Sequence, residues 1–122
     1  MEHEKSADSF GRFLGIKNSD DAPEVWSVKR IEWHQTNDTI VVTLADGEKL
    51  AQATECGTQG KKVDVVSHQP ASHWTVPEKL LGHKVEVVCE LPVLKTHDGG
   101  QPCELTRPLP WETKLNAALV AP

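Results

Sequence analysis

Tyrosine is absent from this chain of 122 residues, methionine occurs once and phenylalanine twice. Aromatic packing therefore depends on the four tryptophans, which we expect to be core anchors or part of a binding surface. The sequence also contains no Cys-x-x-Cys pair, no nucleophile elbow and no phosphate-binding loop. These absences favour a protein that is not an enzyme and that uses no cofactor.

Long apolar runs are missing as well, and no stretch approaches the length of a membrane span. The opening Met1-Glu2-His3-Glu4 lacks the basic start and apolar run of a signal peptide. Cys56, Cys89 and Cys103 make an odd number, so we expect reduced, mostly buried thiols in a cytoplasmic protein. A Cys89–Cys103 disulfide is the alternative.

The balance of charge is mildly acidic, with 13 basic and 18 acidic residues and a formal net charge of −5. Non-specific binding to nucleic acid needs a positive field. The composition therefore disfavours a nucleic-acid partner and leaves another protein as the expected partner.

The clearest strand signals lie in the middle of the chain. Thr39 to Leu44 alternates, breaks at Asp46-Gly47 and resumes at Glu48 to Leu50, which predicts a hairpin. A three-residue loop, Ala45 to Gly47, keeps Leu50 opposite Val42 and is the preferred register.

An earlier strand is predicted from Val25 to His34. Trp26 shares one face with Val28, whereas Ile31 and Trp33 have the opposite parity. One extra residue at Lys29-Arg30 would bring all of them to a single face, so we expect a β-bulge there. Without the bulge, one indole would be exposed beside two basic side chains.

The second half of the sequence predicts further strands and two short helices. A strand is expected near Lys62 to Ser67 and another from His83 to Leu91, with Val85, Val87 and Cys89 facing inward. Residues 68–76 are predicted as a loop, and Pro77 to Gly82 as a helical turn with proline at its start and glycine at its end. The chain then predicts a hairpin formed by Val93–Thr96 and Gln101–Thr106 and an amphipathic helix from Trp111 to Val120.

This order predicts a mainly β fold, a small barrel or β-roll of OB-like or SH3-like type. It includes one helical turn near 77–82 and a short C-terminal helix. Residues 1–9 are predicted to be a flexible N-terminus and residues 10–122 a single β-rich domain. A helical turn containing Phe10, Phe13, Leu14 and Ile16 is expected to dock on the core.

The stretch from Pro77 to Val88 resembles the helix-to-strand passage of OB-type tRNA-binding domains. The small-residue segment that those domains carry after this strand is not matched at Lys95 to Glu104. We therefore take the resemblance as a shared way of entering a strand and not as membership of that family.

A non-catalytic binding module is the function that the sequence favours, with protein–protein contacts made by loops or by an exposed strand face. Loops 54–61, 68–76 and 97–101 are expected to carry contacts, since scaffolds commonly place function there. The candidate binding side chains are aromatic or basic: Trp26, Lys29, Arg30, Trp33 and Trp74. Trp74 and Trp111 flank loops and are expected to be partly exposed. Self-association through an unprotected edge strand is also open.

Two alternatives remain. Single-stranded nucleic acid would bind to an OB-like face that carries Lys29, Arg30, Lys61 and Lys62. A small-ligand or metal site would use His68 and His73, five residues apart, with His34 as a third candidate ligand.

Overall fold

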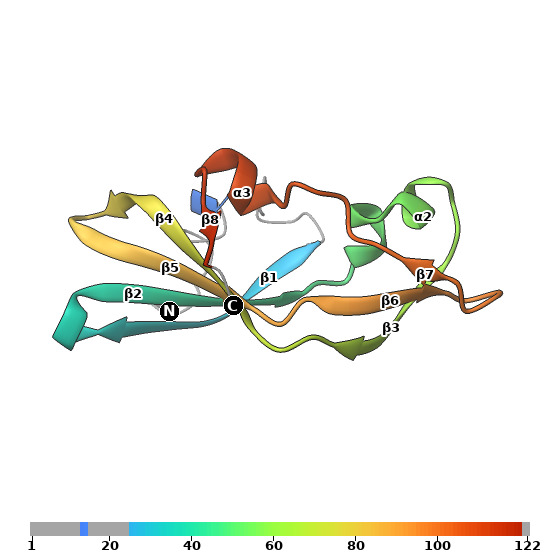
Figure 1. The fold of residues 1–122 in the computed structure, drawn as a ribbon, viewed down its shortest axis with the longest axis horizontal. Coiled ribbons are helices and arrows are strands. Elements are labelled where there is room, and N and C mark those ends of the chain that lie inside the picture. Colours follow the sequence, from blue (N-terminus) through green and yellow to red (C-terminus); the bar gives the residue numbers. More distant parts are fainter. Residues whose placement is uncertain (1–12, 15–24, 121–122) are drawn as a thin grey trace.

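The computed structural model describes residues 13–14 and 25–120, which form two β-sheets arranged along one long axis (Figure 1). The larger sheet has the strand order β1-β2-β5-β4-β8, and the smaller has the order β3-β6-β7. The mainly β class predicted from the sequence is thereby confirmed. The described strands form two sheets and close no barrel, so the OB-like or SH3-like type in that prediction is not confirmed.

The elements have these bounds. The larger sheet contains β1 (Trp26–His34), β2 (Thr39–Asp46), β4 (Ser72–Leu80), β5 (His83–Cys89) and β8 (Ala118–Leu119). The smaller sheet contains β3 (Val63–His68), β6 (Pro92–Thr96) and β7 (Pro102–Cys103). The helical elements are η1 (Gln35–Asn37), η2 (Leu50–Ala53), α2 (Glu55–Thr58) and α3 (Pro110–Lys114).

The predicted β-bulge in the first strand is confirmed, since the register of β1 against β2 shifts between Val28 and Arg30. The shift places Trp26 and Trp33 on one face of the sheet, opposite Asp46 and Ile40 respectively.

The predicted hairpin at Asp46-Gly47 is wrong. The backbone N–H of Gly47 bonds the carbonyl of Val25 at 2.8 Å, and the chain then enters η2 at Leu50 in place of a third strand. The segment Leu-Ala-Gln-Ala favours helical over extended backbone, and Leu50 still reaches the core by this route. The neighbour of β2 is instead β5, which runs parallel to it.

The predicted loop over 68–76 and the predicted helical turn from Pro77 to Gly82 are also wrong, because β4 occupies Ser72–Leu80. Leu81 and Gly82 both have positive φ and join β4 to β5 in a two-residue turn, with Leu80 opposite His83. Pro77 lies where the register of β4 shifts, a position that tolerates the missing N–H. Pro77 thus marks an irregularity in β4, and Gly82 belongs to a hairpin turn. The segment is therefore not the helix-to-strand passage that its sequence resembles.

Several predictions for the second half are confirmed. β3 matches the strand expected near Lys62 to Ser67, and β5 buries Val85, Val87 and Cys89. β6 and β7 flank the expected turn, which the bond from the Thr96 N–H to the Gln101 carbonyl closes at 2.9 Å. The C-terminal helix is shorter than expected: α3 ends at Lys114, and residues 118–119 form β8 beside β4.

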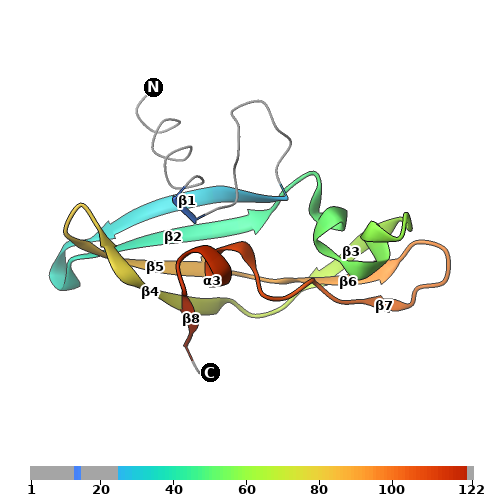
Figure 2. The same cartoon turned by 90° about the horizontal axis from the view of Figure 1, so that it is seen from above.

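The core lies between the large sheet and α3, which Figure 2 shows across the middle of the molecule. Leu14 is fully buried in it, as the predicted docking of the early apolar segment requires. Phe10, Ile16 and the flexible N-terminus predicted over residues 1–9 lie outside the described residues.

Candidate functional site

Three of the four indoles form the centre of the core. The Trp111 ring packs edge-on against both Trp26, at a centroid distance of 5.2 Å, and Trp74, at 5.3 Å. All three side chains are fully buried. The partial exposure expected for Trp74 and Trp111 is therefore wrong, and Trp26 and Trp74 are core residues with no surface to offer a partner.

Trp33 differs from the other three, because 55% of it is exposed. It lies on the same face of the large sheet as Trp26, but near the turn that leads from β1 to β2. Figure 2 shows α3 well away from that end of the sheet. The apolar face is thus covered where Trp111 packs and uncovered where Trp33 lies.

The exposed indole lines an apolar hollow of about 250 Å³. Its lining is Ile31 and Trp33 from β1, Ile40 from β2 and His83 from the start of β5. We call these four residues the Trp33 patch. The imidazole of His83 packs against the indole at a centroid distance of 5.6 Å and an interplanar angle of 65°.

Asp38 bonds the His83 ring, which in turn packs against the Trp33 indole. Its carboxylate is 2.6 Å from Nδ1 of His83, and the nearby Trp33 indole also helps to lower the pKa of Asp38. The bond to His83 is the main reason that the pKa of Asp38 is lower than its ordinary value. Asp38 adopts a left-handed backbone, φ 51°, which aspartate tolerates, and this directs the chain from η1 into β2.

Arg30 lies on the other face of the sheet, and Lys29, the unpaired residue of the bulge, lines the same hollow as Arg30. Arg30 is opposite Thr43, whereas Trp33 is opposite Ile40, and positions an odd number apart on a strand point to opposite faces. Arg30 is also 3.2 Å from the carboxylate of Glu32. The structure therefore does not bring these two cations beside an exposed indole.

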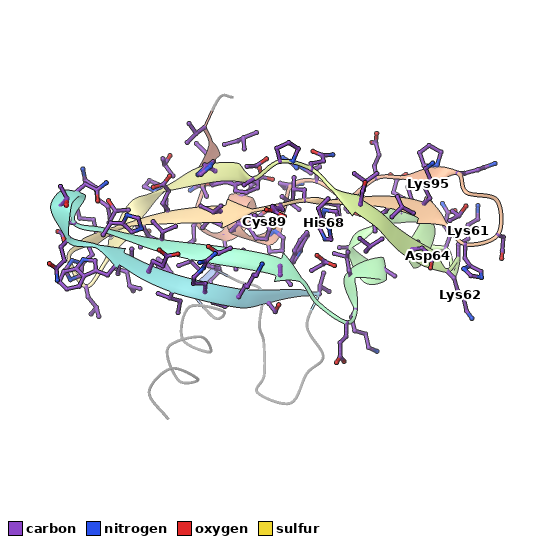
Figure 3. The ribbon with its side chains drawn as sticks, turned by 90° about the horizontal axis from the view of Figure 1, so that it is seen from below. Lys61, Lys62, Asp64, His68, Cys89 and Lys95 are labelled. Carbon is purple, nitrogen blue, oxygen red and sulfur yellow. The ribbon has the colours of Figure 1, made fainter. Side chains whose placement is uncertain are left out.

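The other two predicted cations, Lys61 and Lys62, lie just before β3 of the smaller sheet. Figure 3 shows Lys61 and Lys62 near Lys95, at the end of the molecule where β3 and β6 meet. The four basic residues proposed for nucleic acid thus belong to two separate regions.

The three candidate metal ligands are held by three different carboxylates. His68 Nε2 is 2.9 Å from Asp46, whereas the ring of His73 is 3.6 Å from Glu86 and that of His34 is 3.7 Å from Glu32. Within residues 13–14 and 25–120, no group of three or more His, Cys, Asp or Glu side chains is placed to hold a metal ion.

The predicted contact loops do not include the Trp33 patch. Residues 54–61 contain α2 and the buried Thr54, and residues 72–76 belong to β4. Among the patch residues the sequence singled out only Trp33. The parity shared by Ile31 and Trp33 is a signal for a common face, but nothing in the sequence indicates that Asp38 meets His83.

Comparison of the chain with protein-family models, with curated proteins and with solved structures finds no match. Among the described helices, none has the length and apolar character needed to cross a bilayer.

Proposed function

We propose that this chain is a non-catalytic protein-binding module that contacts its partner through the Trp33 patch. The observation that carries the proposal is the contrast between the indoles, since three are fully buried and Trp33 is 55% exposed. Tryptophan is among the residue types that contribute most to protein–protein affinity, and it does so where a partner excludes water from it. Trp33 lies outside the core that encloses the other three indoles, so its ring is accessible to a partner.

The patch is also ordered before a partner arrives. Asp38 bonds the His83 ring, and that ring packs against the Trp33 indole, which restricts the rotamer freedom that Trp33 has to lose on binding. Association is weakened by each side chain that must be immobilised. A fixed aromatic ring therefore supports binding with a smaller entropic cost.

The size of the hollow favours a protein side chain as its occupant. Small-molecule sites commonly enclose about 300–1,000 Å³ and bury most of their ligand. The hollow at Trp33 has about 250 Å³, and the four described residues that line it are mostly apolar. It fits one or two apolar side chains of a partner better than an enclosed cofactor.

The alternatives receive less support. The net charge is −5, and Arg30 lies on the face opposite the exposed indole, in a hollow that Lys29 also lines, which weakens the proposal of single-stranded nucleic acid. His68 and His73 are each paired with a separate carboxylate, which weakens the proposal of a metal or small-ligand site. A cytoplasmic location remains part of the proposal.

Site-specific photo-crosslinking tests the proposal. A photoreactive phenylalanine analogue replaces Trp33 in one sample and Val66, an exposed residue of β3 in the other sheet, in the second. Each full-length chain is irradiated in an extract of its source cells. We expect one protein to be cross-linked from position 33 and not from position 66.

The cross-linked protein is then purified and titrated with the chain in a calorimeter. Trp33→Ala should weaken binding by about thirtyfold, the effect of a hot-spot residue worth about 2 kcal/mol. Val66→Ala is the matched control and should change the dissociation constant by less than about twofold. Equal affinities for wild type and Trp33→Ala would rule out the Trp33 patch as the contact surface.

A further inference from the structure

Two cysteines from distant parts of the sequence lie against each other at the junction of α2 and β7. An antiparallel bridge joins Thr54 to Leu105, and the N–H of Thr106 bonds the carbonyl of Ala53 at 2.6 Å. Next to this bridge, α2 carries Cys56 and β7 carries Cys103. Each thiol shifts the pKa of the other, so the two side chains lie close together, and both thiols are free.

The surroundings of Cys103 favour its thiolate. Burial raises the pKa of Cys103, but hydrogen bonds with the side chains of Cys56 and Thr54 and with the N–H groups of Cys56 and Gly57 outweigh it, so that the pKa lies below its ordinary value. The bond to Cys103 raises the pKa of Cys56. Of the two, Cys103 is therefore the thiol that ionises first.

Gly57 makes this close approach geometrically feasible. A Cβ atom built at Gly57 would lie 1.7 Å from the carbonyl oxygen of Ala51, so no other residue fits without a backbone shift. The tight turn presents the Gly57 N–H to Thr54 Oγ1 at 2.9 Å, and the same N–H helps to lower the pKa of Cys103. The backbone donors around the sulfur are thus fixed by packing.

Cys89 provides a contrast within the same chain. It is fully buried on β5 in the larger sheet, and burial raises its pKa to about 12. A thiol with that pKa has almost no thiolate at neutral pH and is inert. The disulfide considered from the sequence, Cys89–Cys103, is therefore not the pairing that the structure favours.

We propose that Cys56 and Cys103 are a redox-active pair, in which hydrogen peroxide oxidises Cys103 and Cys56 resolves the product to a disulfide. The Cys103 thiolate attacks one peroxide oxygen, the O–O bond breaks, and the departing hydroxide takes a proton to leave as water. Cys103 then carries a sulfenic acid. The Cys56 sulfur attacks the Cys103 sulfur, the S–O bond breaks, and the hydroxyl leaves with the thiol proton as a second water. Two thiols and one peroxide thus give one disulfide and two waters.

The burial of Cys103 limits the oxidant to a small one. Cys103 is 5% exposed, whereas Cys56 is half-buried. A small peroxide can reach such a sulfur more readily than a bulky disulfide can. The resulting cross-link would tie the η2–α2 segment to β7, and a thiol reductant would release it.

Differential alkylation of the wild-type chain tests the proposal. The reduced protein is exposed to hydrogen peroxide, denatured and treated with N-ethylmaleimide to block the remaining thiols. Disulfides are then reduced, labelled with iodoacetamide and mapped by mass spectrometry. We expect iodoacetamide on Cys56 and Cys103, N-ethylmaleimide on Cys89, and complete reversal when a thiol reductant is added before blocking.

Cys89→Ser is the matched control and should oxidise as the wild type does. Cys56→Ser should leave Cys103 as a sulfenic acid that dimedone traps, because its resolving thiol is gone. N-ethylmaleimide on all three cysteines after peroxide treatment would overturn the proposal, as would an iodoacetamide label on Cys89. Both of the overturning outcomes are measured on the wild-type chain, so they do not depend on the folding of the variants.

Discussion

Glu112→Ala tests the attachment of α3 to the large sheet. The Glu112 carboxylate accepts bonds from the backbone N–H of Leu109 at 2.8 Å, from Nε1 of Trp74 at 2.9 Å and from Arg107 at 3.0 Å. Trp74 and Leu109 are buried, so both donors lose their partner without access to water when the carboxylate is removed. Each buried donor left unsatisfied costs about 1–3 kcal/mol, whereas the exposed Arg107 adds little.

We therefore expect the free energy of unfolding to fall by about 3 kcal/mol, and the melting temperature to fall by about 10 °C. Urea unfolding followed by tryptophan fluorescence measures the free energy of unfolding, provided that the m-value is the same in wild type and variant. Glu112→Gln keeps the shape and one acceptor oxygen and should lose roughly half as much. Glu104→Ala, an exposed control on the same stretch, should stay within about 0.5 kcal/mol of wild type. A loss in Glu112→Ala no larger than that of the control would refute the assignment of Glu112 as the residue that holds α3.

Three further predictions follow from local geometry. Leu81 is 90% exposed with φ 52°, so Leu81→Asn should stabilise the β4–β5 turn by about 0.5–1 kcal/mol, measured as a higher urea midpoint. The pKa of Asp38 is lowered, so its contribution to stability is present above the ordinary carboxyl pKa and is lost as the pH falls through the folded value. Emission from the exposed Trp33 should report that loss in acid, and Asp38→Asn should remove the titration. The bond to Asp64 raises the pKa of His97, so this pair stabilises the fold below the ordinary imidazole pKa and stops doing so as the pH rises through the folded value. An NMR titration of His97 should show the raised pKa in wild type and an ordinary one in Asp64→Asn.

Local periodicity was sufficient to predict several strands and one irregularity. The parity conflict between Trp26 and Trp33 located the bulge, and the alternation of Val85, Val87 and Cys89 gave the buried face of β5. These features depend on neighbours in sequence, which a pattern can read. The same patterns did not give strand order, because the partner of β2 is β5 and not the next segment along the chain.

The candidate site was predicted only in part, for a related physical reason. Parity assigns a side chain to a face but does not say how far α3 extends over that face. Trp26 and Trp33 share a face, and only the first lies under Trp111. The contact of Asp38 with His83 joins two turns that are distant in sequence, and the contact of Cys56 with Cys103 depends on the bridge between Thr54 and Leu105. Tertiary placement decides each of these.

The parallel pairing of β2 with β5 has a consequence for biosynthesis. Thr39 lies opposite Lys84, so the centre of the large sheet stays open on a ribosome-bound chain until β5 has emerged. Until then the hydrogen-bonding edge of β2 is unsatisfied on one side, a state prone to association between nascent copies. The long segment between β2 and β5 must close into a loop before the two strands pair, and this entropic cost also slows folding. Slow or crowded translation should therefore lower the yield of native protein more for this chain than for one built from consecutive hairpins.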